Sequence, residues 1–254
     1  MVSSLSSKIS VLFIVEGASA EPKIIKKICS IIGNKDYEIY SYKTSIYELY
    51  DELVFDDDLD IHLLLREKES DLRLKTIFDK KYTRTYLVFD YDPHYQKFDH
   101  AKVKHMLSYF TESSDKGKLY INYPMMESHR HLLCMPDKAF LDRVIHKHDI
   151  VEYKRVVGDV SFYTDLSKYD YSTIKEMVAH HLIKYNYLLF GSKRLPDKST
   201  WDDWSSIEDI EMLDLQQKTY SRDELYVLNT SIFYVIDIKP KTFFHTGFSA
   251  YSLE

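Results

Sequence analysis

The chain has 254 residues, 44% of them hydrophobic and 29% charged, and this length fits one large domain or one domain with an appendage. Only six glycines and six prolines argue against a disordered or collagen-like chain. A formal net charge of −6 argues against a protein that binds nucleic acid through bulk positive charge. The two cysteines match no zinc-binding spacing, whereas the 22 tyrosines are unusually many.

The N-terminal segment is polar and rich in serine up to Ser10. The apolar run that follows, Val11 to Val15, is too short for the core of a signal peptide. The longest apolar stretches elsewhere are also too short to cross a bilayer. We therefore expect a cytoplasmic protein with no membrane association.

The first half of the chain alternates between strand and helix patterns. A helix with Pro22 in its first turn is expected to end at Gly33, and apolar spacing predicts further helices over residues 45–55, 63–80 and 99–110. β-branched and aliphatic runs predict strands over residues 9–15, 37–42, 85–89 and 118–123. This alternation predicts an α/β fold with a mostly parallel sheet of about four strands, flanked by helices.

The second half of the chain has a different pattern and becomes mainly helical from Pro136. Apolar residues at helical spacing predict a helix over residues 173–190, and a loop is expected over residues 191–206. Residues 221–238 fit a helix, with a strand as the alternative. We predict an α/β domain over residues 8–135 and a mainly helical C-terminal extension over residues 136–254.

Carboxylates follow three of the four predicted strands. Glu16 comes directly after the first, Asp90 and Asp92 follow the third, and Glu127 lies a short turn beyond the fourth. The carboxyl ends of parallel strands meet at one edge of a sheet, where ligands bind. Clustered carboxylates suit Mg²⁺ or Mn²⁺, because hard cations prefer oxygen ligands. The pattern therefore indicates metal-assisted phosphoryl transfer.

Three segments around these carboxylates resemble the Toprim fold, and most of all its RloB and OLD-nuclease-like branch. The run FIVEGASAEP (residues 13–22) is similar to the first Toprim motif, although Ala20 stands where that branch usually has threonine. The run VFDYDPH (residues 88–94) is similar to the second motif, and NYPMME (residues 122–127) resembles a later element of the branch. The resemblance extends over about residues 10–133.

The resemblance implies a metal-dependent nuclease. Glu16 would be the general acid/base or a metal ligand, and Asp90 and Asp92 would hold Mg²⁺ or Mn²⁺. Glu127 and Glu21 would be candidates for additional ligands. The Toprim proteins of this size also include effectors of anti-phage defence, which often work with a separate ATPase, and this sequence contains no P-loop of its own.

Two residues near the carboxylates are candidates for substrate contacts. Lys23 lies at the start of the helix after Glu16, where a phosphate group would bind. His94 adjoins the proposed metal ligands and is a candidate phosphate contact, with a plain turn residue after Pro93 as the alternative. The expected partner is DNA or a structured RNA, and a homo-oligomer is one way for an acidic chain to supply positive surface.

Two other functions fit part of the same pattern. In a haloacid-dehalogenase-like phosphatase Asp90 would be the nucleophile, but that motif has threonine or valine where His94 stands. In a non-catalytic Toprim-like module the same scaffold would bind a partner or nucleic acid without cleaving it. Loss of Mg²⁺-dependent cleavage on substitution of Glu16 or Asp92 separates a nuclease from both.

Two His-x-His pairs follow the fourth predicted strand. The first is His129 with His131, and the second is His146 with His148. Zinc binding is conceivable, but alternate residues on a helix do not share a face. We therefore expect all four to be surface or partner-contact histidines.

Overall fold

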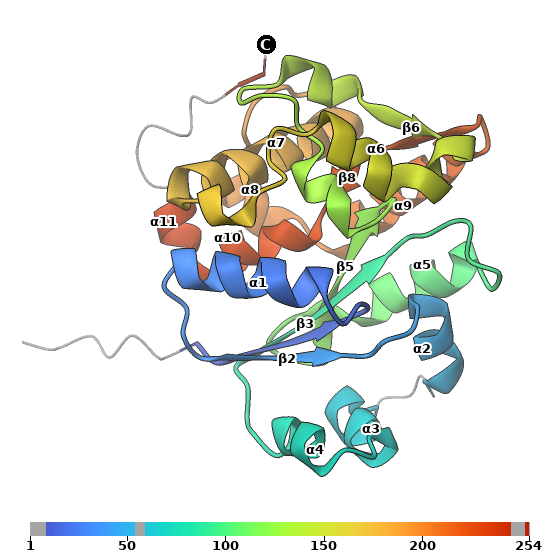
Figure 1. Ribbon diagram of the computed structural model, residues 1–254, viewed down its shortest axis with the longest axis vertical. Coiled ribbons are helices and arrows are strands. Elements are labelled where there is room, and N and C mark those ends of the chain that lie inside the picture. The colour runs from blue at the N-terminus through green and yellow to red at the C-terminus, as the bar shows by residue number, and fades with distance from the viewer. Residues whose placement is uncertain (1–8, 54–58, 245–251, 254) are drawn as a thin grey trace, which may run out of the picture.

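The computed structural model describes residues 9–53, 59–244 and 252–253 (Figure 1). In this part of the chain six strands form one mixed sheet in the order β2–β1–β3–β5–β4, with β8 also paired to β5. A separate two-stranded sheet joins β6 and β7. The strands are β1 (Val11–Val15), β2 (Tyr37–Ser41), β3 (Arg84–Asp90), β4 (Thr111–Glu112), β5 (Gly117–Tyr123), β6 (Val144–His146), β7 (Glu224–Tyr226) and β8 (Leu228–Asn229).

The four longer strands of the main sheet, β2, β1, β3 and β5, run parallel, as expected. The short strands β4 and β8 are antiparallel to β5, so the sheet is mixed. Each of these two strands has only two residues, which is too short for a recognisable sequence period. The predicted α/β architecture with flanking helices is confirmed, whereas a mostly parallel sheet of four strands is an incomplete description.

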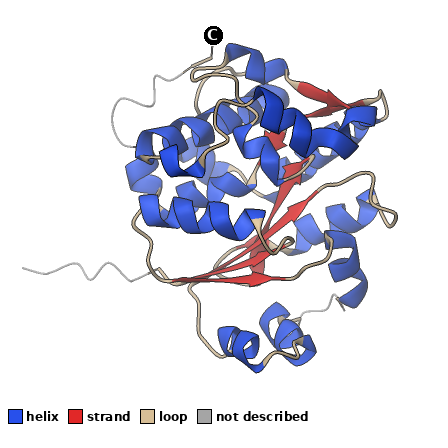
Figure 2. Cartoon of the chain, in the orientation of Figure 1, coloured by secondary structure: helices blue, strands red, loops and turns tan. Residues whose placement is uncertain are grey.

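The helices make up most of the remaining chain (Figure 2). The α-helices are α1 (Ala20–Ile31), α2 (Ile46–Glu52), α3 (Ile61–Lys68), α4 (Leu72–Phe78), α5 (His100–Tyr109), α6 (Tyr153–Val160), α7 (Tyr171–Phe190), α8 (Lys198–Asp203), α9 (Ser206–Tyr220), α10 (Tyr234–Ile238) and α11 (Pro240–Phe244). The 3₁₀ helices are η1 (Met126–Arg130), η2 (Lys138–Asp142), η3 (Lys147–Glu152), η4 (Leu166–Lys168) and η5 (Ser231–Phe233). None of the helices described is long and apolar enough to span a membrane.

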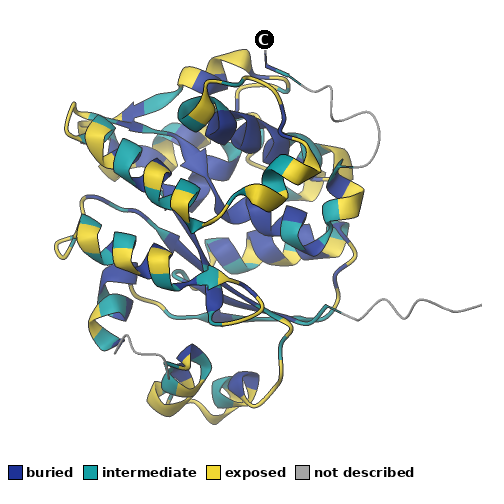
Figure 3. Ribbon diagram, turned by 180° about the vertical axis from the view of Figure 1, so that it is seen from behind, coloured by how far each residue is buried: buried dark blue, intermediate teal, exposed yellow. Residues whose placement is uncertain are grey.

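Helices cover both faces of the sheet (Figure 1). On one face the Phe13 ring of β1 packs edge-on against Tyr234 of α10, with ring centroids 4.9 Å apart. On the other face Tyr40 of β2 packs against Phe78 of α4 at 4.8 Å. β1 lies between two strands and two helical layers, which is why all five of its residues are apolar and fully buried. Figure 3 shows exposed residues gathered on the outer helix faces.

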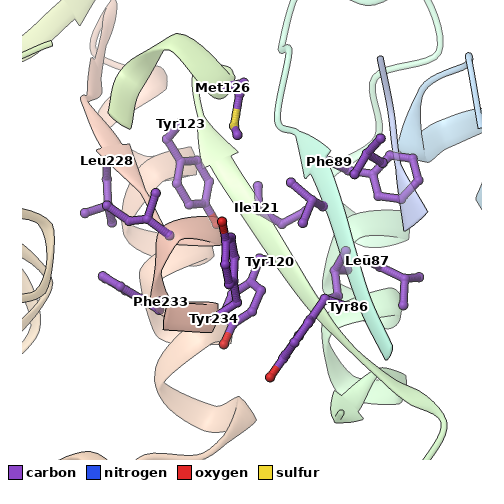
Figure 4. Close-up of a cluster of buried hydrophobic side chains, with 14 of the residues drawn as sticks. Tyr86, Leu87, Phe89, Tyr120, Ile121, Tyr123, Met126, Leu228, Phe233 and Tyr234 are labelled. Atoms are coloured by element: carbon purple, nitrogen blue, oxygen red, sulfur yellow. The ribbon is translucent and has the colours of Figure 1, made fainter. Parts of the chain in front are cut away.

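The C-terminal half shares the core of the sheet. β8 pairs with the end of β5, and the Thr230 hydroxyl bonds both the N–H and the C=O of Ile121, at 3.0 and 2.8 Å. Leu228, Phe233 and Tyr234 lie against side chains of β3 and β5 in the same cluster (Figure 4). Residues of the predicted extension therefore complete the hydrophobic face of the predicted α/β domain.

Some predicted helix boundaries are wrong, and capping residues explain why. The single helix expected over residues 63–80 is two helices, because the Asp71 side chain accepts the Arg73 N–H at 2.8 Å and starts α4. Asp60 likewise caps α3, because its side chain accepts the His62 and Leu63 N–H groups at 2.8 and 3.1 Å. The loop expected over residues 191–206 contains α8, and residues 221–238 form β7, β8, η5 and α10.

Candidate active site

The strand order creates a topological switch point at the carboxyl ends of β1 and β3. From β1 the chain passes to β2 on one side and later returns to β3 on the other. Ligands of open α/β sheets bind in the crevice beyond the strand ends at such a point. Glu16 directly follows β1, and Asp90 is the last residue of β3. Both residues therefore lie where this topology favours a binding site.

The loops at the switch point are joined by two hydrogen bonds that backbone N–H groups donate. The Glu16 N–H donates to Val88 O at 3.1 Å, and the Asp90 N–H donates to Glu16 Oε2 at 3.1 Å. Burial raises the pKa of the Glu16 carboxyl to about 7, although the hydrogen bond from Asp90 opposes this shift. The charges of Glu21 and Asp92 raise the same pKa. A carboxyl that titrates near neutrality is suited to exchange protons with a substrate or with water.

The Asp90 carboxylate also faces β5. Asp90 and Asn122 are paired in the β3–β5 register, and Asn122 Nδ2 donates to Asp90 Oδ1 at 3.1 Å. The pKa of Asp90 is raised well above its ordinary value, first by burial and next by the charges of Glu16 and Glu21. A cation bound among these carboxylates would lower their pKa values and keep them ionised.

Glu21 reaches the same place from the first turn of α1. Its carboxylate lies so close to Gly17 that a Cβ at that glycine would be 2.4 Å from Glu21 Oε2. Burial raises the pKa of Glu21, backbone N–H groups lower it, and the charge of Glu127 raises it again, for a net rise. The glycine after Glu16 is therefore required by this close approach of a carboxylate to the backbone.

Glu127 lies in η1, directly beyond β5, and is 8% exposed. Its Oε2 atom is buried and has no hydrogen-bond partner among the described residues. Its Oε1 atom lies 3.7 Å from Nζ of Lys154, which comes from α6. Burial lowers the pKa of Lys154, but the charges of Glu127, Asp90 and Glu21 raise it more. We call Glu16, Glu21, Asp90 and Glu127 the carboxylate cluster.

The C-terminal region holds the η1 turn in place. Asn229 Nδ2 donates to Met126 O at 3.1 Å and to Ser128 Oγ at 3.2 Å. The Asn229 N–H donates to His181 Nδ1 at 3.0 Å, so the neutral His181 ring carries its proton on Nε2 and donates it to His129 O at 3.2 Å. All of these groups are buried. The position of Glu127 therefore depends on α7 and β8.

Asp92 lies beside the cluster in an unusual backbone conformation. Its φ is 27°, in the left-handed region that costs a non-glycine residue about 1 kcal/mol or more. The Asp92 N–H donates to Pro124 O at 3.2 Å, and its C=O accepts the Tyr95 N–H at 3.0 Å. The charge of Asp92 raises the pKa of Glu16, so its carboxylate lies near that of Glu16. Strained conformations of this kind gather at functional sites.

The two predicted substrate contacts differ in their surroundings. Lys23 lines a hollow beside the cluster that Glu127 and Arg130 also line. His94 is exposed, and its Nε2 atom lies 2.8 Å from Lys147 O. Lys23 therefore lies near the cluster, whereas the His94 ring is hydrogen-bonded to the backbone of η3.

The cluster suits a divalent cation by its chemistry. All its side-chain donors are carboxylate oxygens, and the buried Glu127 Oε2 lacks a partner among the described residues. Within the same residues no three His, Cys, Asp or Glu side chains converge closely enough to surround a metal ion. A Mg²⁺ or Mn²⁺ ion held here would therefore take at most two of these carboxylates directly and would complete its coordination with waters. Glu16, Asp90, Asp92 and Glu127 are the residues available for this role.

Three polar residues of the site carry no assigned role in the sequence analysis. Asn122 lies inside the Toprim-like segment, and its register with Asp90 identifies it once the strands are paired. Arg130 follows Glu127 by three residues within η1. Lys154 comes from α6 and has no local motif, so only the tertiary structure reveals it.

The expectation for the first His-x-His pair is wrong. His129 and His131 are 1% and 6% exposed and belong to the core rather than to the surface. Burial lowers the pKa of each imidazole to about 4. Periodicity could not show this, because η1 is an irregular turn that the C-terminal half covers. His146 and His148 are exposed, as expected.

Comparison with known proteins adds no further constraint. No protein-family model, no curated protein and no solved structure matches this chain.

Proposed function

We propose that this chain is a metal-dependent hydrolase that cleaves phosphodiester bonds in nucleic acid, like the Toprim nucleases that it resembles. The main support is that acidic side chains from separate elements lie near enough at the switch point of the sheet for their charges to raise one another's pKa values. The members are Glu16, Glu21, Asp90 and Glu127. Their mutual repulsion and their burial favour a bound metal ion. The ammonium group of Lys154 already supplies a positive charge that acts on several of these carboxylates.

Each residue then has a role that follows from its surroundings. Bound Mg²⁺ or Mn²⁺ would stabilise negative charge on the phosphate and favour ionisation of water. Asp90, Asp92 and Glu127 would hold the cation. Glu16, kept ionised by the cation, would accept the proton of the attacking water. Lys23 would bind the phosphate beside the start of α1.

The direct test combines cleavage with metal binding. We expect the purified chain to cleave DNA or RNA with Mg²⁺ or Mn²⁺ and not with EDTA. Glu16→Gln is expected to lower the rate by at least about 100-fold, in line with loss of a general base. Asp90→Asn is expected to weaken binding of Mn²⁺ in calorimetry. Glu67→Gln, on the exposed surface of α3, is the matched control and should change neither.

A non-catalytic Toprim-like module is the second candidate, and two observations favour it. No three ligand side chains converge on one point in the described residues, and Lys154 already supplies a positive charge beside Glu127. This alternative predicts no Mn²⁺ binding and equal biological activity of the wild-type chain and Glu16→Gln. Metal-dependent cleavage that is lost in Glu16→Gln would reject it.

A further inference from the structure

Helix α1 is flanked by a hollow on each side, and both lead to the loop after β1. The first lies between α1 and β2, the edge strand of the sheet, and residues of both elements line it. We call it the edge groove. It is lined by Ala18, Pro22, Lys26, Lys35, Tyr37, Glu38, Ile39 and Ser41.

The second hollow lies between α1 and the C-terminal half, and we call it the inner groove. Glu127 of the carboxylate cluster forms part of its wall. Its other lining residues are Ser19, Ala20, Lys23, Ile24, His129, Arg130, Thr164 and Leu166. Lys26 lies four residues after Pro22 and faces the edge groove, whereas Lys23 faces the inner groove. Ala18 lines the edge groove and Ser19 lines the inner groove, so both hollows reach the loop that leads from Glu16 into α1.

The basic side chains of both grooves are available to a ligand. Within the described residues, Lys23, Lys26 and Lys35 are exposed and make no ion pair, and neither does Arg130. Some other lysines are paired with a carboxylate, as Lys80 is with Glu38 at the edge groove. In a chain with a net charge of −6, these free positive charges gather around one helix. Lysines spaced along a groove attract the repeated charges of a phosphodiester backbone.

We propose that the two grooves bind one continuous single strand of nucleic acid, which crosses the N-terminal end of α1 and brings a phosphodiester to the carboxylate cluster. This inference rests on the proposed function and specifies its substrate. A duplex is stiff over about 150 base pairs and cannot dip into a recessed site between two grooves, whereas a single strand can follow the path. The half-buried Tyr37 ring in the edge groove gives a base a surface for stacking.

The experiment measures binding apart from cleavage. Fluorescence anisotropy of labelled DNA and RNA strands in EDTA gives the affinity of the uncleaved complex over a range of salt concentrations. Each phosphate contact adds about 0.7 to the slope of log affinity against log salt for single strands. Lys26→Gln with Lys35→Gln should therefore reduce that slope by about 1.4 and lower the affinity at low salt. Tyr37→Leu should weaken binding by about tenfold, and Tyr37→Phe should not.

The control variant carries the same charge change elsewhere. Lys81→Gln with Lys218→Gln neutralises two exposed lysines outside both grooves and should leave the slope within error of wild type. Equal slopes for the two double variants, or a duplex that binds as tightly as its single strand, would overturn the inference. Tighter binding of either DNA or RNA supports it and identifies the sugar. Strand binding without metal-dependent cleavage would reject the proposed nuclease while leaving the grooves as a binding site.

Discussion

The carboxylate cluster and the buried histidines of the C-terminal half show two outcomes of burying titratable groups. Burial favours the neutral form in both regions, raising the pKa of the acids and lowering the pKa of the imidazoles. The histidines find partners for their ring nitrogens. The pairs are His129 with Met126 O at 2.7 Å, His131 with the Tyr153 hydroxyl at 3.0 Å, and His180 with the Asp137 N–H at 2.9 Å.

The carboxylates are less well satisfied. Glu127 Oε2 has no partner in the described part of the chain, and the nearest cation to Glu127 is 3.7 Å away. Buried polar groups are normally hydrogen-bonded, so an exception calls for an explanation such as a ligand or an ion. The difference is that the buried histidines bond to protein groups, whereas Glu127 Oε2 has no partner among the described residues; under the proposed function a cation would occupy this place. The buried histidine region in turn positions Glu127, because His181 and Asn229 donate hydrogen bonds to the backbone of η1.

The largest expected loss of stability comes from substituting Asn229, which links the buried histidines to the turn that carries Glu127. Asn229→Ala removes two donated and two accepted side-chain hydrogen bonds from the core. We expect the free energy of unfolding to fall by about 3–4 kcal/mol, because several buried polar groups lose their partners. Chemical denaturation measures this loss. Gln217→Ala, on the exposed face of α9, should cost less than about 0.5 kcal/mol, and a similar cost for both would contradict the role of Asn229.

Protonation of the buried histidines should destabilise the fold in acid. Burial lowers the pKa of His131 from 6.5 to about 4, so between these pH values the unfolded chain binds a proton that the folded chain does not. Stability should therefore fall by about 3 kcal/mol as the pH decreases through this window. His131→Gln should remove that part of the pH dependence, measured by denaturation at several pH values. His148→Gln, at a side chain that is 78% exposed, should leave it unchanged.

The contribution of the carboxylate cluster to stability should change with pH in the opposite direction. The pKa of Glu16 is raised from 4.5 to about 7, so the folded, metal-free chain keeps a proton that the unfolded chain has lost. Stability should fall by at most about 3 kcal/mol as the pH rises from 4.5 to 7, and Glu16→Gln should remove this decrease. Thermal or chemical unfolding in EDTA tests it. An unchanged pH profile in Glu16→Gln would show that other groups dominate.

The smallest expected change in stability comes from replacing glycines. Comparing Gly17→Ala with Gly158→Ala separates displacement of the Glu21 carboxylate from the general effect of a less flexible backbone. Gly17→Ala places a methyl group where Glu21 Oε2 now lies and should displace that carboxylate, at a cost of about 1 kcal/mol and with weaker Mn²⁺ binding. Gly158→Ala in α6 meets no atom within 4 Å and should instead stabilise the chain slightly. Denaturation and calorimetry on the two variants give the comparison. Equal Mn²⁺ affinity in both would exclude Glu21 from the metal site.

Local sequence was sufficient for much of the candidate site. Glu16 and Asp90 follow buried strands, and parallel pairing of those strands brings their carboxylates together. Glu21 was a candidate only through the resemblance to Toprim proteins, and the structure places its carboxylate against Gly17. Lys154 and Asn229 could not be found in this way, because their contacts with η1 join segments that are separated by two dozen residues or more.

The sequence by itself determined the parallel strands, the helix after β1 and the acidic residues at the strand ends, since each depends on short-range periodicity and on turn residues such as Gly33. The structure also accounts for part of the composition. Some of the acidic residues form a buried cluster, and many tyrosines, such as Tyr86 and Tyr234, pack in the core. Only the tertiary structure decided the mixed edge of the sheet, the burial of His129 and the two grooves beside α1. The pairing of β8, the burial of His129 and the inner groove depend on how the C-terminal half packs on β5, whereas the edge groove depends on how α1 packs beside β2. No local pattern specifies either arrangement.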